Sequence, residues 1–232
     1  MRKVVLDVSM SLDGFTAGPN VREDEPMGDG GERLHAWMAG NGTDSEIDVA
    51  VRREVDATVG AAVIARRTFD LGVGPWGGTP WPGVPSFEVT HRARKDLLGD
   101  NGGTFAFDGL QAAVRRAKQA AGHKDVLVLG ADVARHLLRA ELLDEIHVHL
   151  VPLLLGAGTP LFDGEQAELI SEGKPVTGTV TPPALPGPAL RIVLPAIASP
   201  FRRGQLTIKE THDGQSVHPH DDVAGWVHRG SE

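Results

Sequence analysis

The stretch from Val126 to Arg139 reads VLVLGADVARHLLR and joins a predicted strand to a predicted helix. Val126–Leu129 is apolar throughout, which is typical of a strand that is covered on both faces of a sheet. We expect Asp132–Arg139 to be helical, with Gly130 at the turn between the two elements. A glycine there lets the backbone approach a ligand, and a helix N-terminus offers free N–H groups to a phosphate.

The same alternation of short strands and helices extends along the chain to about residue 151. Apolar runs identify the strands, and apolar residues four apart identify the helices. We expect further strands at Lys3–Ser9, Ala61–Ala65, Ser86–Thr90, Thr104–Phe107 and Ile146–Val151, and further helices at about Glu46–Val59 and Gly109–Ala121. The order β-α-β-β-β-α-β-α-β predicts an α/β fold, with a central, mostly parallel twisted sheet flanked by helices.

The helix near residue 110 carries the clearest end signals. Asp108 and Gln111 have the spacing of a capping box at its start. Gly122 stands just beyond its last residue, where a glycine commonly ends a helix. The loop expected over 72–85 is rich in glycine, proline and tryptophan.

Charge and composition narrow the classes of function. The 232 residues carry a formal net charge of −8, which argues against general nucleic-acid binding because phosphate backbones are held by an excess of Lys and Arg. The chain has no cysteine, so disulfides, thiolate nucleophiles and Cys-based zinc sites are excluded. It shows neither a signal-peptide pattern nor a membrane-length apolar run, so we expect a cytoplasmic protein without membrane attachment.

The length suggests one domain and a tail. We expect the domain to occupy residues 1–195 and a polar, mobile tail to occupy 196–232. Residues 173–190 contain five prolines, which should interrupt any strand ladder. Residues 210–232 are polar and include four histidines, and we expect them to be dispensable for ligand binding.

Two basic clusters follow two consecutive predicted strands. Arg66-Arg67-Thr68 comes directly after Ala61–Ala65, and His91-Arg92-Ala93-Arg94-Lys95 follows Ser86–Thr90. Guanidinium groups bind phosphate oxygens bidentately. In a chain of net negative charge, the two clusters predict an anion site at one edge of the sheet. The alternative is that they are solvated surface arginines.

The first predicted strand ends in a polar turn that contains Asp13 and Gly14. Ligands of open α/β sheets bind at the carboxyl ends of the strands, so this turn is a candidate for the site. An ordinary Asp-Gly turn is at least as good an interpretation.

Two other patterns do not support a site. Residues 72–77 match G-x-G-x-x-G, yet no helix is predicted to follow and prolines do, so the dinucleotide-binding context fails. His147 and His149 lie on one face of a predicted strand, and His218 and His220 form a second pair. Zinc needs three or four converging ligands, so we expect no metal.

Six ordered motifs resemble the C-terminal reductase domain of the bifunctional riboflavin-biosynthesis enzyme, and still more the stand-alone bacterial dihydrofolate reductase family proteins. The resemblance covers residues 1 to about 165. The motifs are Ser11–Gly14, Ala65–Phe69, Val89–Arg92, Val128–Ala134, Leu142–His147 and Val151–Phe162.

The resemblance implies that NADPH lies across the carboxyl ends of the strands. Residues Ala65, Arg66, Arg67 and Thr68 would hold the 2′-phosphate side of NADPH, helped by Thr90, His91 and Arg92. The pyrophosphate would meet Gly130, Ala131, Asp132 and Val133. The nicotinamide and substrate pocket would be lined by Val8, Ser9, Asp13, Gly14 and Ala17. Asp13 is the candidate for proton supply or substrate anchoring.

Some positions depart from the family pattern. Ala65 and Ala131 stand where the family has glycine, and Glu88 occupies a strand position that is normally apolar. Leu129 replaces a Glu of the riboflavin enzyme, which argues against its phosphoribosylamino-uracil substrate. The last strands of the family are not recognisable after residue 165.

We therefore expect an NADPH-dependent reductase that transfers hydride to a C=N or C=O of a small heterocyclic, pterin- or pyrimidine-like, or carbonyl substrate. One alternative is a non-catalytic NADP(H)- or ligand-binding protein that retains the fold, and another is a metal-dependent hydrolase. The resembling family pairs through its late strands, so we also expect a homodimer, favoured by the apolar run Leu153-Leu154-Leu155.

Overall fold

A computed structural model describes residues 2–38, 46–92, 95–99, 101–167, 169–171 and 189–193. The expected tail over 196–232 lies outside these residues. Within them the chain forms the strands β1 (Val4–Ser11), β2 (Phe15–Ala17), β3 (Val59–Ala65), β4 (Ser86–Val89), β5 (Leu97–Leu98), β6 (Thr104–Asp108), β7 (Asp125–Leu129), β8 (Glu145–Val151), β9 (Thr159–Pro160), β10 (Ile170–Ser171) and β11 (Ala189–Val193). The helices are η1 (Gly31–Met38), α1 (Glu46–Thr58), α2 (Arg66–Gly72), α3 (Leu110–Ala120) and α4 (Ala131–Arg139).

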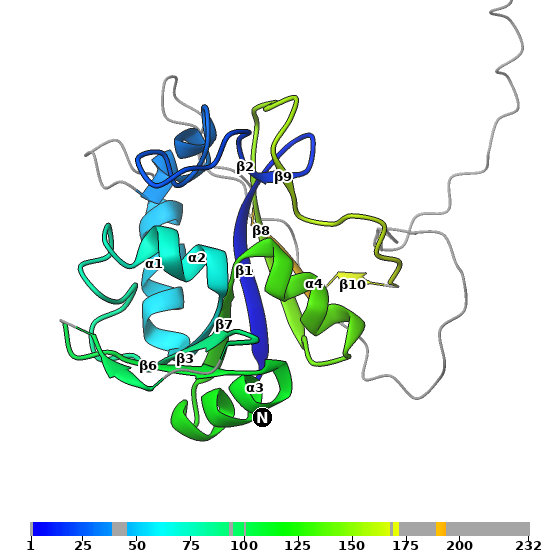
Figure 1. Cartoon of the computed structure of the whole chain (residues 1–232). Coiled ribbons are helices and arrows are strands. Elements are labelled where there is room, and N and C mark those ends of the chain that lie inside the picture. Colours follow the sequence, from blue (N-terminus) through cyan, green and yellow to red (C-terminus); the bar gives the residue numbers. More distant parts are fainter. Residues whose placement is uncertain are drawn as a thin grey trace, which may run out of the picture.

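The described strands form a mixed, mostly parallel sheet in the order β10-β11-β8-β1-β7-β3-β4-β6-β5 (Figure 1). All neighbours from β8 to β6 are parallel, whereas β5, β11 and β10 are antiparallel to their neighbours. A separate pair, β2 and β9, joins the loop after β1 to the loop after β8. The sheet confirms the expected α/β fold.

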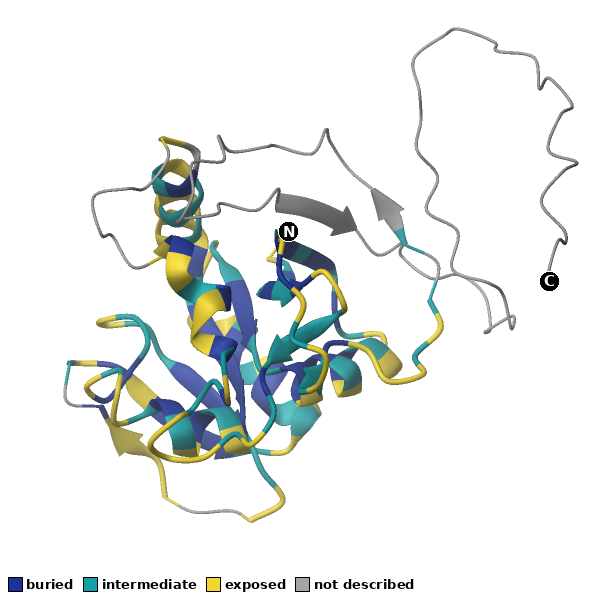
Figure 2. Ribbon diagram, turned by 90° about the horizontal axis from the view of Figure 1, so that it is seen from above, coloured by how far each residue is buried: buried dark blue, intermediate teal, exposed yellow. Residues whose placement is uncertain are grey.

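Helices cover both faces of the sheet because the central strands are apolar on both sides. Val4, Leu6, Val63 and Val128 face α3 and α4 in the largest core cluster. The opposite face packs against α1, α2 and η1 through three smaller clusters. Figure 2 shows the buried strands between helices whose outer faces are exposed.

Three local features differ from what the sequence predicted. Arg66–Gly72 forms the helix α2, for which no element was predicted; Phe69 of this helix packs edge-on against Phe105 and Phe107 with ring centroids 4.8 and 5.7 Å apart. No capping box forms at α3, since its N-cap is Gly109 and no side chain caps it. The carboxylate of Asp108 instead accepts a hydrogen bond from Arg116 at 2.9 Å.

The third correction concerns the late strands. β10 and β11 do form, and β11 pairs antiparallel with β8 along its whole length, from Ala189 opposite His149 to Val193 opposite Glu145. The prolines of 173–190 therefore do not prevent a strand from beginning at Ala189. The central strand β8 thereby gains a hydrogen-bonding partner on its outer side.

Candidate functional site

The candidate residues converge on the carboxyl edge of the parallel sheet. β4, β3, β7 and β1 are consecutive neighbours, and each is followed by one group of candidates. Arg66–Thr68 follow β3, Thr90–Arg92 follow β4, Gly130–Val133 follow β7, and Asp13–Gly14 follow β1. Parallel pairing alone brings these groups, far apart in sequence, to one edge.

The turn after β7 lies directly against the turn after β3. Gly130 has φ +105°, and a Cβ built on it would lie 2.5 Å from Thr68 Oγ1 and 2.9 Å from Ala65 Cβ. Only glycine fits this position without displacing a neighbour. The close approach holds the N-terminus of α4 beside Thr68, so the donors of two turns share one edge.

The N-terminus of α4 presents its backbone to that edge. Gly130 is the N-cap and no side chain caps the helix. Ala131 and Val133 bury their side chains in the core, whereas Asp132 is exposed. The first N–H groups of a helix lack intrahelical acceptors, so these backbone groups are suited to an anion. The buried side chains of Ala131 and Val133 anchor the helix N-terminus in the core and cannot contact a ligand themselves.

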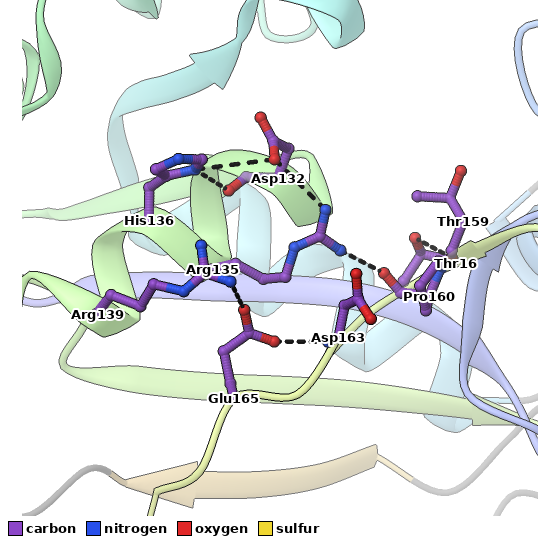
Figure 3. Close-up of polar contacts among 9 residues, drawn as sticks. All are labelled: Thr16, Asp132, Arg135, His136, Arg139, Thr159, Pro160, Asp163 and Glu165. Atoms are coloured by element: carbon purple, nitrogen blue, oxygen red, sulfur yellow. Dashed lines mark hydrogen bonds and ion pairs between the residues drawn. The ribbon is translucent and has the colours of Figure 1, made fainter.

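Figure 3 shows how α4 is tied to the loop after β8. Arg135 donates to the Pro160 carbonyl at 2.7 Å and pairs with Asp132 at 3.4 Å. Glu165, almost fully buried as a side chain, pairs with Arg139 and accepts from the Asp163 N–H at 2.5 Å. These contacts fix the loop that carries β9 against α4, whose N-terminus lies at the candidate site.

The arginines of the edge are engaged with protein groups. Arg66 donates to Asp70 at 2.8 Å and lies 3.5 Å from the buried carboxylate of Glu88. The hydrogen bond with Asp70 raises the pKa of Arg66. Arg67 donates to the Val21 carbonyl at 3.1 Å and is exposed. Glu88, unusual for its strand position, is thus a neighbour of the basic cluster.

The turn after β4 is closed by its own groups. The Thr90 hydroxyl accepts from the Arg92 N–H at 3.1 Å, and the Thr90 N–H donates to the Asp108 carbonyl at 2.9 Å. The side chains of His91 and Arg92 are exposed. Both side chains therefore remain accessible to a ligand that lies along the edge.

The candidate residues in and just after β1 lie on different faces of the sheet. Ser9 is buried and accepts a hydrogen bond from Trp37 Nε1 at 3.0 Å on the η1 face. Val8 packs against the core on the opposite face. Ala17 lies in β2, where Gly158 approaches its carbonyl so closely that a Cβ would stand 2.0 Å away. Gly14 has φ +89° in the turn. A ligand at this edge would meet the strand end rather than all of these side chains.

Asp13 anchors a loop. Its carboxylate accepts hydrogen bonds from Ser11 Oγ at 2.6 Å, from Leu155 N at 3.1 Å and from Gly156 N at 2.7 Å. The Ser11 hydrogen bond, together with these backbone donors, lowers the pKa of Asp13. A carboxylate with these partners is ionised at neutral pH and is a poor proton donor. Its position suits loop anchoring.

Sequence reasoning missed an ionisable cluster on the η1 face of β1 and β8. His149 Nε2 lies 2.9 Å from Asp7 Oδ1, and His147 Nδ1 lies 3.5 Å from Asp7 Oδ2. The alternation His147-Val148-His149 was visible, but nothing in the sequence pointed to Asp7. No group of three or more His, Asp or Glu in the described part of the chain is arranged to hold a metal ion. None of the described helices is long and apolar enough to cross a membrane.

The fold and this edge define the class: a dihydrofolate-reductase-like α/β protein. The family model of the RibD C-terminal domain matches residues 88–175. This match, together with the solved structures below, confirms the resemblance that the sequence motifs indicated.

Two proteins of Bacillus subtilis (strain 168), both uncharacterized, are similar to most of the chain. YwjB is 26% identical over 176 residues, which are 75% of this chain and 87% of YwjB. YyaP is 24% identical over 173 residues, which are 69% of this chain and 80% of YyaP.

Two solved structures share the fold. One is a protein of Shewanella sp. PV-4 provisionally described as a riboflavin biosynthesis protein, with a TM-score of 0.58, 21% identity, and coverage of 84% of this chain and 99% of its own. The other is a dihydrofolate reductase of Enterococcus faecalis in complex with NADP(H) and RAB-propyl, with a TM-score of 0.52 and 15% identity. That alignment covers 83% of this chain and 95% of the reductase.

Proposed function

We propose that the protein is an NADPH-dependent reductase that binds the cofactor along the carboxyl edge of β1, β7, β3 and β4. The observation that carries the proposal is the close approach of Gly130 to Thr68 and Ala65. It sets an uncapped helix N-terminus beside a hydroxyl and an arginine cluster, in a chain whose net charge is −8. Such a donor set suits a phosphorylated dinucleotide.

The residues of the edge fit the two phosphate regions of this cofactor. The N–H groups at Ala131–Val133 would meet the pyrophosphate, and Thr68, Arg67 and Arg92 would meet the 2′-phosphate. Arg67 would exchange its bond to the Val21 carbonyl for a stronger one to phosphate. The related fold of Enterococcus faecalis dihydrofolate reductase, solved with NADP(H), supports this choice.

When bound, the nicotinamide would supply hydride to a C=N or C=O of a small heterocyclic or carbonyl substrate. The protein's share is to position the two reactants and exclude water. The loop fixed by Asp13, at Leu155 and Gly156, and the loop fixed by Arg135, at Pro160, would form the walls at the β1 end of the edge. Asp13 serves in this scheme as an anchor and not as the proton donor.

The test compares affinities for NADPH and NADH in wild-type protein, in Arg67→Ala and in Arg115→Ala. Arg115 is an exposed arginine on α3, outside the candidate set, and serves as the matched control. A charge-assisted hydrogen bond contributes about 1.5–3 kcal/mol, so Arg67→Ala should weaken NADPH binding by about ten- to a hundredfold. Binding of NADH should change little. Equal affinity of the wild-type protein for both cofactors would contradict the proposal.

Turnover separates a reductase from a binding protein that retains the fold. Single-turnover oxidation of NADPH is followed with pterin, flavin and carbonyl probes. Tight NADPH binding without oxidation by any probe would favour the binding protein.

We also propose a homodimer. Leu154 and Leu12 are 68% and 61% exposed, and the Leu12 N–H donates to the Leu153 carbonyl at 2.9 Å, so the two exposed leucines belong to adjoining segments. Apolar side chains gathered in this way are commonly covered by a second copy.

A further inference from the structure

A row of ionisable side chains runs along β1 and β8 on the face that carries η1. Lys3 pairs with Glu145, whose other carboxylate oxygen lies 3.2 Å from His147 Nε2. His147 Nδ1 lies 3.5 Å from one oxygen of Asp7, and His149 Nε2 lies 2.9 Å from the other. The side chain of Lys3 is 40% exposed, whereas those of Glu145 and His149 are 2% and 6% exposed. The row therefore leads from solvent into the protein.

The inner end of the row lies two residues before the carboxyl ends of β1 and β8. Ser9 and His149 are register partners across β1 and β8. The indole of Trp37 lies against the His149 ring at a centroid distance of 4.6 Å and donates to Ser9 Oγ. Ser9 lies two residues before the end of β1, at the edge where the cofactor is proposed to bind.

Stability by itself does not require charged residues here. Burying an ion pair costs desolvation free energy that its attraction rarely repays, and apolar residues of similar volume are often as stable. Beside the row, Leu34 and Val151 are buried in an apolar cluster. A carboxylate with two imidazoles in such a place has the chemistry of a proton-transfer system.

The hydrogen bonds define the state of the rings. Burial by itself would raise the pKa of Asp7, but the hydrogen bonds and charges of His147 and His149 outweigh it and lower the pKa to about 2. An ionised carboxylate only accepts hydrogen bonds, so Nε2 of His149 must carry a proton. Its Nδ1 is then the nitrogen that can take up or release a second proton, with the resulting charge stabilised by Asp7.

We propose that His149 supplies the proton for reduction from its Nδ1, and that Asp7, His147 and Glu145, the rest of this path of ionisable groups, hold the ring and stabilise its charge, an inference that rests on the proposed function. Reduction of C=N or C=O adds hydride to the carbon and one proton to the nitrogen or oxygen, while the dihydronicotinamide is oxidised to NADP⁺. The protein must therefore deliver one proton per turnover. His149 is the inner member of the path, and Asp7 and His147 are positioning residues.

Other ionisable groups adjoin the path. They are Lys3 on β1, His35 on η1 and Arg52 on α1, which donates to the Trp37 carbonyl at 3.0 Å. Burial, and next the charge of His149, lowers the pKa of His35 to about 4. His35 is thus neutral at pH 7 and does not compete for the proton.

The test uses the full chain with Asp7→Asn, His149→Gln and the control Asp96→Asn. Asp96 is an exposed aspartate whose partner, Arg116, lies on α3. Imidazole ¹⁵N spectra, recorded without any ligand, should show changed ring-nitrogen shifts of His147 and His149 in Asp7→Asn and unchanged shifts in Asp96→Asn. Unchanged shifts in Asp7→Asn would overturn the proposal.

The second measurement is single-turnover oxidation of NADPH in H₂O and in ²H₂O, with whichever pterin, flavin or carbonyl probe the wild-type protein reduces. Asp7→Asn and His149→Gln should slow the step by about a hundredfold or more and enlarge the solvent isotope effect. The dissociation constant for NADPH should stay within about twofold of wild type, since no path residue belongs to the proposed phosphate donors. A folded variant with wild-type rate and isotope effect would overturn the proposal.

The two proposals fail differently. Absence of NADPH binding or of turnover in the wild-type protein is a failure of the reductase function, and the proton path falls with it. Turnover that survives loss of both Asp7 and His149 leaves the reductase standing and removes only the proton path. Asp7 and His149 lie on different strands. If one variant does not fold, the other still tests the proton path.

Discussion

Replacing Gly130 by alanine should test the geometry on which the proposed cofactor site depends. The new Cβ would stand 2.5 Å from Thr68 Oγ1 and 2.9 Å from Ala65 Cβ, at φ +105°. A backbone conformation that only glycine adopts readily costs about 1–3 kcal/mol for another residue. Overpacking of a close contact costs about 1–3 kcal/mol more. The free energy of unfolding should therefore fall by about 2–6 kcal/mol.

Gly122→Ala provides the matched control. Gly122 also has a positive φ, +65°, but a Cβ there would meet nothing within 4 Å. Only the conformational cost of about 1–2 kcal/mol applies. Gly130, at φ +105° and ψ 131°, also has a higher backbone cost than Gly122, so the excess loss in Gly130→Ala contains this difference as well as the close approach of the two turns. The part of the loss that Thr68→Ala recovers measures the contact itself.

Urea unfolding followed by circular dichroism gives both free energies. Adding Thr68→Ala to Gly130→Ala removes the nearest contact and should recover part of the loss, although Ala65 remains. Affinity for NADPH should fall in Gly130→Ala and stay near wild type in Gly122→Ala. If Gly130→Ala loses no more stability than Gly122→Ala, the turns after β3 and β7 do not touch as described.

Three further outcomes are expected. The pKa of His35 is lowered to about 4 from an ordinary value of 6.5, so the unfolded chain binds more protons than the folded chain between these values. The free energy of unfolding should therefore fall as pH is lowered from 6.5 to 4. Thermal unfolding of His35→Gln should show a smaller loss over this range. Asp7, with its pKa lowered to about 2, contributes stability that is complete above about pH 4 and is lost as pH falls toward 2; equal acid sensitivity of wild type and Asp7→Asn would contradict this. Sedimentation equilibrium at micromolar concentration should give a mass of about twice 24.6 kDa for the wild-type protein. A folded Leu154→Glu variant should have the mass of one chain. A wild-type mass near 24.6 kDa would reject the dimer.

Residues 210–232 lie outside the described residues, so the expectation that they are dispensable rests on composition alone. Limited proteolysis should cut there first, and the truncated chain should bind NADPH as the full chain does. Unfolding of the truncated chain would refute the expectation.

The sequence by itself determined the alternation of elements and the edge at which the candidates meet. Apolar runs such as Val126–Leu129 mark strands buried on both faces, because only a sheet covered by helices on both sides removes every side chain from water. Parallel pairing then sends Arg66, Thr90 and Gly130 to one edge without any knowledge of distances. These signals are local in the sequence, so they do not depend on how individual side chains pack.

The tertiary structure alone decided what depends on contacts distant in sequence. Arg66–Gly72 has weak helical signals in the sequence. Its helix is stabilised by the packing of Phe69 against Phe105 and Phe107. β11 is short and follows a proline-rich segment, but the outer side of β8 supplies backbone partners that no local pattern reveals. Asp7 and His149 are separated by 142 positions in the sequence, and only the register of β1 against β8 sets them 2.9 Å apart. The edge at which the candidate residues meet could thus be read from the sequence. The hydrogen bonds of the proposed proton path could not, because a hydrogen bond between strands depends on their register.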